Sequence, residues 1–131
     1  MNKLRLIATA VLLTATLALA DEKAGLEKGR ALTKSLYQGE VDPIWSKFSD
    51  EMKNLLKTKA TFEQFQKQVK QSLPEEKILK ETVQEVGDST LYSRWAKFKS
   101  STTPFLVQWS FKADGTITGM LVKPNQTPPA E

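Results

Sequence analysis

The side chains best placed to do chemistry are a guanidinium and a phenol on two neighbouring predicted strands. If the loop 100–104 folds these strands back on each other, Arg94 lies opposite Trp109 and Tyr92 lies opposite Phe111 on an otherwise apolar face. A cation among aromatic rings in a concavity is a natural site for a carboxylate or another anion. Tyr92, Arg94 and Trp109 are therefore the predicted ligand-binding residues.

The sequence leaves two other interpretations of Arg94 open. A β-bulge or a slip of the register turns its side chain away from the concavity. Alternatively, Arg94 lies at the end of the sheet and pairs with a nearby glutamate. Neither arrangement offers a free guanidinium to a ligand.

The amino-acid composition excludes the commonest catalytic groups. The chain has no histidine and no cysteine, so it has no Ser–His or Cys–His nucleophile and no thiolate metal site. A carboxylate beside Tyr37 or Tyr92 is the remaining acid–base route, but the aspartates are interpreted as helix caps, first-turn residues or turn residues. These aspartates are Asp42, Asp50, Asp88 and Asp114. We therefore expect no catalytic residue, no metal and no cofactor.

Residues 1–20 have the pattern of a signal peptide. Lys3 and Arg5 precede an apolar run over residues 6–19, and Ala18-Leu19-Ala20 puts small residues where a signal peptidase cleaves. The run of about 14 residues is shorter than the roughly 18 to 20 residues that span a bilayer, so we expect no transmembrane anchor, with a retained anchor as the alternative. A cleaved, cysteine-free product carries no lipid anchor, which predicts a periplasmic or secreted protein.

The rest of the 131-residue chain predicts one domain over residues 21–124 and a disordered, proline-rich tail over residues 125–131. Loss of Lys3 and Arg5 lowers the net charge from +4 to +2. A mixed surface of this kind does not favour nucleic acid as a partner.

Helical signals fill the first half of the chain. Apolar residues at three- or four-residue spacing predict a helix that ends at Gly39. Asp42 and Ser49 are predicted N-caps of two short helices. The capping box Thr61-Phe-Glu-Gln64 is expected to begin a further helix, which Pro74 ends.

Strand signals fill the second half. Residues 78–86 are mixed, with Leu79 and Val83 among charged residues, as expected of a partly exposed strand. Residues 91–99 form the next predicted strand, and a hairpin follows over 105–124. Helices followed by an antiparallel meander indicate an α+β domain, with the helices packed on one face of the sheet.

The final hairpin has a predicted register. A type I turn over 113–115, with glycine at positive φ, pairs Phe111 with Ile117 and Trp109 with Gly119. We expect Gly119→Val to crowd Trp109 and to cost about 1–3 kcal/mol.

The same register places an apolar patch on the face of the sheet away from the helices. Such a patch favours a protein partner, or a homodimer through this outer face. Cover by the N-terminal helix or by the tail is the alternative. The predicted partner residues are Trp95, Leu106, Gln108 and Met120.

Several motifs resemble those of a known fold. They are Phe48-Ser49, Met52-Lys53, and the stretch from Val107-Gln108-Trp109 through Asp114-Gly115 with Ile117, Gly119 and Pro124. Over residues 24–124 the chain resembles the cone-shaped α+β fold of the nuclear transport factor 2-like superfamily. Within it, the chain is similar to a secreted bacterial family of unknown function whose domain also occurs beside α/β hydrolases. The resemblance implies a curved sheet around helices, often a pocket at the wide end, and frequent dimerisation through the outer face.

Together these features predict a small exported, non-catalytic domain that binds an unknown small molecule or protein. The alternative is a cofactor-free cavity enzyme that uses a carboxylate and a tyrosine. Burial of a carboxylate near Tyr92 would favour the enzyme, and a self-complementary apolar outer face would favour a dimer.

Overall fold

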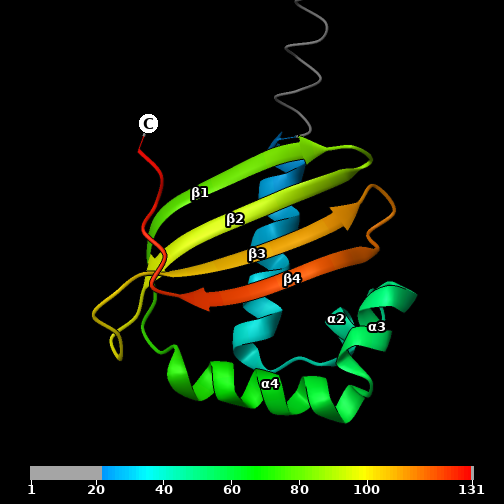
Figure 1. Cartoon of the computed structure of the whole chain (residues 1–131), viewed down its shortest axis with the longest axis horizontal. Helices are drawn as coiled ribbons and strands as arrows, with labels where there is room; N and C mark the ends of the chain where they lie inside the picture. Colours follow the sequence, from blue (N-terminus) through cyan, green and yellow to red (C-terminus); the bar gives the residue numbers. More distant parts are fainter. Residues whose placement is uncertain (1–21, 131) are drawn as a thin grey trace, which may run out of the picture.

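The computed structural model describes residues 22–130 as helices followed by an antiparallel sheet (Figure 1). The predicted signal peptide lies outside these residues. The N-terminal helix covers residues 22–38 of the described chain. The elements that follow are α2 (Asp42–Trp45), α3 (Asp50–Leu56), α4 (Lys59–Ser72), β1 (Lys77–Val86), β2 (Ser89–Lys97), β3 (Phe105–Lys112) and β4 (Ile117–Pro124).

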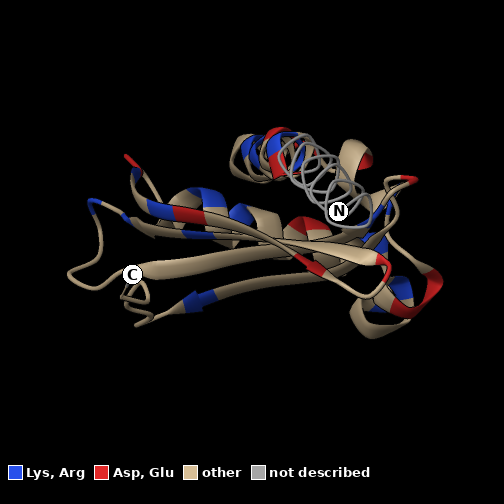
Figure 2. Ribbon diagram, turned by 90° about the horizontal axis from the view of Figure 1, so that it is seen from above, with Lys and Arg blue, Asp and Glu red and all other residues tan. Residues whose placement is uncertain are grey.

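Within residues 22–130 the strands form one four-stranded sheet in the order β1-β2-β3-β4, with every neighbouring pair antiparallel. The N-terminal helix crosses one face of this sheet, which we call the inner face, and α4 runs along the side of β4 (Figure 1). The opposite face is called the outer face. The predicted α+β class is confirmed. Acidic and basic residues are interspersed along the described helices and strands (Figure 2).

Local capping explains where most helices begin and end. The N-terminal helix ends at Gly39, which has φ +76°; the Gly39 N–H bonds to Leu36 O and the Glu40 N–H bonds to Ser35 O, the Schellman pattern. The hydroxyl of Ser49 accepts from the Met52 N–H at 3.2 Å at the start of α3. The predicted stop at Gly39 and cap at Ser49 are confirmed.

Two predicted caps are wrong. Asp42 is the first residue of α2 rather than its cap, and its carboxylate pairs with Lys59 at the start of α4. The cap of α4 is Thr58, whose hydroxyl accepts from the Thr61 N–H at 3.1 Å. The helix therefore begins before Thr61, because Thr58 offers the same capping oxygen three residues earlier.

The β3–β4 hairpin confirms its predicted turn but not its whole register. Phe111 pairs with Ile117, as expected, and Gly115 has φ +92°. A β-bulge then leaves Thr118 unpaired, and its hydroxyl bonds to Ser110 O at 3.3 Å. Gly119 consequently lies opposite Ser110, so Gly119→Val would crowd Ser110, at 3.3 Å from the added Cβ, rather than the indole of Trp109.

The bulge also changes the faces of β4. Met120 pairs with Trp109 and Val122 pairs with Val107, and both β4 side chains pack against the core on the inner face. The predicted place of Met120 on the outer face is therefore wrong, because one extra residue in a strand moves every later side chain to the other face.

The β2–β3 register is shifted by two residues from the prediction. Arg94 pairs with Val107, and Tyr92 pairs with Trp109. The cause is a longer connection: Phe98 leaves the sheet and packs edge-on against Phe105, with ring centroids 5.7 Å apart. A two-residue shift keeps each side chain on its predicted face, so the error in register does not change which residues point inward.

Glycine allows the N-terminal helix to lie very close to the sheet. A Cβ built on Gly29 would stand 2.1 Å from Cγ of the fully buried Tyr92. One built on Gly25 would stand 2.7 Å from Cγ1 of Val83. The ring of Tyr92 thus takes the space that any other side chain at position 29 would need.

Gly29→Ala is predicted to destabilise the fold by about 1–3 kcal/mol. Alanine is about 1 kcal/mol more favourable than glycine within a helix. Helix propensity alone would therefore raise the stability, and a loss of stability would come from the clash with Tyr92. Urea denaturation measures the change, and Gly25→Ala, whose Cβ meets only the methyl ends of Val83 and Thr90, should lose less. An unchanged or raised stability of Gly29→Ala would contradict the close approach.

Candidate functional site

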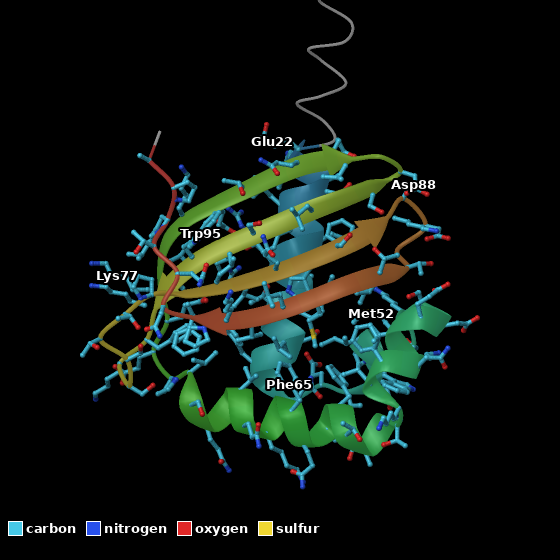
Figure 3. All side chains as sticks on the ribbon, viewed as in Figure 1. Glu22, Met52, Phe65, Lys77, Asp88 and Trp95 are labelled. Atoms are coloured by element: carbon cyan, nitrogen blue, oxygen red, sulfur yellow. The ribbon has the colours of Figure 1, made fainter. Side chains whose placement is uncertain are left out.

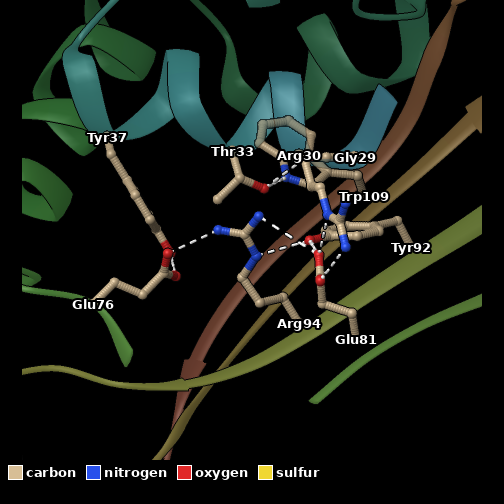
Figure 4. Close-up of polar contacts among 9 residues, drawn as sticks. All are labelled: Gly29, Arg30, Thr33, Tyr37, Glu76, Glu81, Tyr92, Arg94 and Trp109. Atoms are coloured by element: carbon tan, nitrogen blue, oxygen red, sulfur yellow. Dashed lines mark hydrogen bonds and ion pairs between the residues drawn. The ribbon is translucent and has the colours of Figure 1, made fainter. Parts of the chain in front are cut away.

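Polar side chains of the N-terminal helix, the sheet and the connection before β1 meet in what we call the polar network (Figure 4). Its members are Arg30, Thr33, Tyr37, Glu76, Glu81, Tyr92, Arg94 and Trp109. On β2, Tyr92 and Arg94 are two positions apart and so share the inner face. Glu81 pairs with Arg94 across the β1–β2 ladder. The helix contributes side chains at three- and four-residue spacing, which places them on the stripe that faces the sheet.

Arg94 is the centre of this network and is only 6% exposed. Its Nε donates to the Tyr92 hydroxyl at 2.7 Å, and its Nη1 donates to Glu76 Oε1 at 2.8 Å. Its Nη2 lies 3.7 Å from Glu81 Oε2. The second oxygen of Glu76 accepts from the Tyr37 hydroxyl at 2.7 Å. The guanidinium therefore already has two carboxylates of the same chain as partners.

Glu81 receives two hydrogen bonds from Arg30 in a fork. Arg30 Nε donates to Oε2 at 3.0 Å, and Nη2 donates to Oε1 at 2.7 Å. The Tyr92 hydroxyl donates to the same Oε2. Because Arg30 comes from the helix and Glu81 from the edge strand β1, this fork ties the helix to the sheet.

Trp109 is fully buried and its indole is hydrogen-bonded. Its Nε1 donates to Thr33 Oγ1 at 3.0 Å, and that hydroxyl donates to the Gly29 carbonyl at 2.7 Å. The hydroxyl of Thr33 thus accepts from the indole and donates to the helix backbone, so the buried N–H and the buried hydroxyl both have hydrogen-bond partners.

Burial and the charged groups of the network together set the protonation states of its members. The hydrogen bonds from Arg30 lower the pKa of Glu81 and outweigh the opposing effect of burial. Burial, followed by the hydrogen bond to Glu81, raises the pKa of Tyr92. Burial and the charge of Glu76 raise the pKa of Tyr37. At neutral pH the carboxylate of Glu81 is thus ionised and both phenols are protonated donors.

The lowered pKa of Glu81 predicts a loss of stability in acid. A carboxyl group whose pKa is lower in the folded state contributes stability above its unfolded pKa of about 4.3, and that contribution disappears as the pH falls through the folded value. The free energy of unfolding of wild type should therefore exceed that of Glu81→Gln at pH 7, and the difference should shrink below about pH 4.

Chemical denaturation at a series of pH values measures this difference. Glu51→Gln, at an exposed position of α3, is the control for the loss of one negative charge. A difference between wild type and Glu81→Gln that is the same at every pH would contradict the assigned role of the Glu81 charge.

The structure brings the predicted ligand residues together but surrounds them with protein. Tyr92 and Arg94 are in contact, and Trp109 lies opposite Tyr92 in the ladder. The pairing of Arg94 with a glutamate, which the sequence left open, occurs twice. These three residues line none of the four cavities found around residues 22–130.

Sequence reasoning did not find Arg30, Thr33, Glu76 or Glu81, and it named Tyr37 only as a tyrosine that could act with a carboxylate. A signal for Glu81 existed, because it lies two residues before Val83 in the same strand and so shares the face on which Val83 packs against the core. Arg30 and Tyr37 are seven residues apart, close to two helical turns, and therefore share a helix face. Nothing in the sequence pairs Glu76 with Arg94, since Glu76 lies in the connection between α4 and β1.

A surface groove lies at the end of the sheet where the β1–β2 and β3–β4 turns meet the N-terminal helix; Asp88 marks the first of these turns (Figure 3). It consists of two cavities, about 300 Å³ and about 80 Å³, that share Lys28 and Phe111. We call it the Lys28 groove. Its other polar residues are Ser35, Lys47, Glu85, Asp88, Thr90 and Lys112.

Charged groups in the Lys28 groove are loosely held. Lys28 Nζ lies 5.6 Å from the centroid of the Phe111 ring and 3.4 Å from the Ala113 carbonyl oxygen. Lys112 Nζ and Asp88 Oδ2 are 3.9 Å apart, with both side chains exposed. These groups can change partners at little cost, unlike the buried groups of the polar network.

The predicted partner face is only partly as expected. Trp95, Leu106 and Gln108 lie on the outer face, where Trp95 pairs with Leu106 (Figure 3). Leu121, which is 39% exposed and pairs with Gln108, takes the place predicted for Met120.

The C-terminal tail crosses part of this outer face. The Gln126 N–H bonds to the Pro104 carbonyl at 3.0 Å, and Lys80 Nζ donates to the Pro129 carbonyl at 3.1 Å. Residues 125–130 thus pass from the end of β4 toward β1 (Figure 1). Leu106 is only 8% exposed, so it adds little free apolar surface to this face.

Comparison of the chain with protein-family models, with curated proteins and with solved structures finds no match. Among residues 22–130, no helix is both long and apolar enough to cross a bilayer. The same residues contain no group of three or more acidic side chains placed to hold a metal ion. The function is therefore inferred from the geometry of the chain itself.

Proposed function

We propose that this protein is a small exported, non-catalytic domain that binds a small ligand in the Lys28 groove. The observation that carries the proposal is the larger cavity, about 300 Å³, which lies at the lower end of the size range of small-molecule sites. Its lining combines one aromatic ring, Phe111, with convergent charged groups that have no strong partners.

The polar network supports this proposal by making the walls of the groove rigid. One wall is the N-terminal helix and the other is formed by the turns of the sheet. The Arg30–Glu81 fork and the Trp109–Thr33 bond hold these two parts together. A preformed groove loses less conformational entropy when a ligand binds, which favours affinity.

A small-molecule fragment library, screened by amide chemical shifts in 1H–15N spectra, tests the proposed groove. Fragments that bind should shift the amides of Lys28, Thr90 and Gly115 together, because all three residues line the groove. Lys28→Glu should weaken the binding of anionic fragments about tenfold, through charge repulsion.

Lys34→Glu is the matched control, since Lys34 is exposed on the same helix and lines neither cavity of the groove. It should leave fragment binding unchanged. Fragments whose shifts cluster elsewhere, or an equal loss of binding in both variants, would remove the basis of the proposal.

A second candidate function is a cavity enzyme that uses Glu81 and Tyr92. The contact between this carboxylate and the Tyr92 hydroxyl favours it, because Glu81 is largely buried. Its weakness as an acid–base site is the lowered pKa of Glu81, since a carboxylate held ionised by two arginines is a poor base. Turnover of any substrate in a panel by wild type, abolished in both Glu81→Gln and Tyr92→Phe, would establish this alternative.

Export is supported by the charged start, the short apolar run and the small residues at 18–20. When the full-length chain is expressed in a Gram-negative host, the protein recovered from the periplasm should have the mass of a chain that begins at Asp21. Recovery of the uncut chain with the membranes would show a retained anchor instead.

A homodimer through the outer face is the proposed mode of self-association. The exposed Leu121 and the half-buried Trp95 supply its apolar surface, and the tail limits how much of the face is free. Sedimentation equilibrium should give twice the chain mass, and Leu121→Lys should return it to the mass of one chain. A single-chain mass for wild type at high concentration would exclude the dimer.

The likeness to the nuclear transport factor 2-like superfamily stays part of this proposal. Its support is the arrangement of helices on one face of an antiparallel meander. That arrangement supports a similarity of fold, whereas the proposed function depends on the Lys28 groove.

A further inference from the structure

Glu76 reaches the buried Arg94 from outside the regular structure. It follows α4, which ends at Ser72, and it immediately precedes β1. One carboxylate oxygen accepts from Arg94 Nη1 at 2.8 Å, and the other accepts from the Tyr37 hydroxyl at 2.7 Å (Figure 4). A guanidinium and a phenol, on β2 and on the N-terminal helix, thus clasp one carboxylate between them.

The donors of this clasp are preorganised without Glu76. Arg94 is held by the Tyr92 hydroxyl at 2.7 Å and by the nearby carboxylate of Glu81. Tyr37 packs edge-on against the buried Phe98, with ring centroids 6.0 Å apart. If Glu76 is removed, part of the positive charge of the buried Arg94 has no negative partner. The space left by the Glu76 carboxylate therefore favours another anion.

Glu76 is the more replaceable of the two carboxylates beside Arg94. Glu81 lies within β1 and is fixed by two hydrogen bonds from Arg30. Glu76 lies in the short connection 73–76, next to Glu75, which has φ +52°, a left-handed conformation that is unfavourable for a residue other than glycine. Its side chain is 16% exposed, so solvent reaches it.

We propose that Arg94 Nη1 and the Tyr37 hydroxyl form a carboxylate-binding site, and that Glu76 is an internal occupant which the carboxylate of a small molecule can replace. The ligand contributes one carboxylate, accepts both hydrogen bonds, and leaves Glu76 to solvent. This site is separate from the Lys28 groove and shares no residue with it.

Competition with Glu76 sets the affinity of the wild-type protein. The carboxylate of Glu76 is tethered to the site and therefore acts at a high effective concentration. The apparent Kd of an external carboxylate for wild type is the intrinsic Kd divided by the fraction of molecules in which Glu76 is displaced. Removal of the Glu76 carboxylate should therefore strengthen the binding of an external carboxylate at least about tenfold.

Titration of Glu76→Ala with sodium acetate tests the proposal. Acetate should raise the melting temperature of this variant and bind it at least about tenfold more tightly than it binds wild type, whereas sodium chloride at the same ionic strength should not. Adding Tyr37→Phe should weaken acetate binding to Glu76→Ala, because one of the two donors is lost.

Glu75→Ala is the matched control, since Glu75 is the neighbouring residue and pairs only with the exposed Lys99, at 3.7 Å, among the described residues. It should respond to acetate as wild type does. If Glu76→Ala fails to fold, Glu76→Gln keeps the size of the side chain without its charge, and acetate should still bind it more tightly than wild type.

An acetate effect on Glu76→Ala or Glu76→Gln no larger than that of chloride, or an equal effect on Glu75→Ala, overturns the proposal. The outcome is independent of the groove. Lys28→Glu, which damages the groove, should leave acetate binding to Glu76→Ala unchanged, so that failure of one site is distinguishable from failure of the other.

Discussion

The contact between Gly29 and the ring of Tyr92 is the constraint on which the rest of this structure depends. It lets the backbone of the N-terminal helix lie against the sheet at a distance that no side chain at position 29 would allow. At that distance Thr33 reaches the indole of Trp109 and Arg30 reaches Glu81. A helix held further away would leave the buried N–H of Trp109 without a partner, which costs more free energy than the hydrogen bond itself contributes.

The polar network combines two guanidinium groups with two carboxylates on the inner face of the sheet, where Arg94 is buried and Arg30 lies at the surface. Buried ion pairs of this kind often add little net stability, because desolvation offsets much of the attraction between the charges. Their directional hydrogen bonds instead define one position of the helix on the sheet. Glu76 and Glu81 occupy the positions beside Arg94 that the carboxylate of a ligand would take. The weakly paired charges of the Lys28 groove are therefore more accessible to a ligand than Arg94 is.

How far the sequence predicts this site differs from residue to residue. The inward direction of Tyr92 and Arg94 follows from alternation, and it survives the two-residue shift of register because an even shift preserves the faces. The predicted face of Met120 is wrong because of one bulge at Thr118, whose hydroxyl donates to the Ser110 carbonyl. Local patterns do not reveal whether a strand accommodates an extra residue, since the partner strand and its side chains decide that.

The amino-acid sequence by itself determined the α+β class, the ends of several helices, and the absence of histidine and cysteine chemistry. These properties depend on local geometry and composition, which the neighbouring residues in the chain control. Tertiary structure alone decided that Glu76 and Glu81 occupy the site of Arg94 and that the Lys28 groove lies where two turns meet a helix. Those contacts join segments far apart in the chain, and they exist only once packing has set the distance between the helix and the sheet.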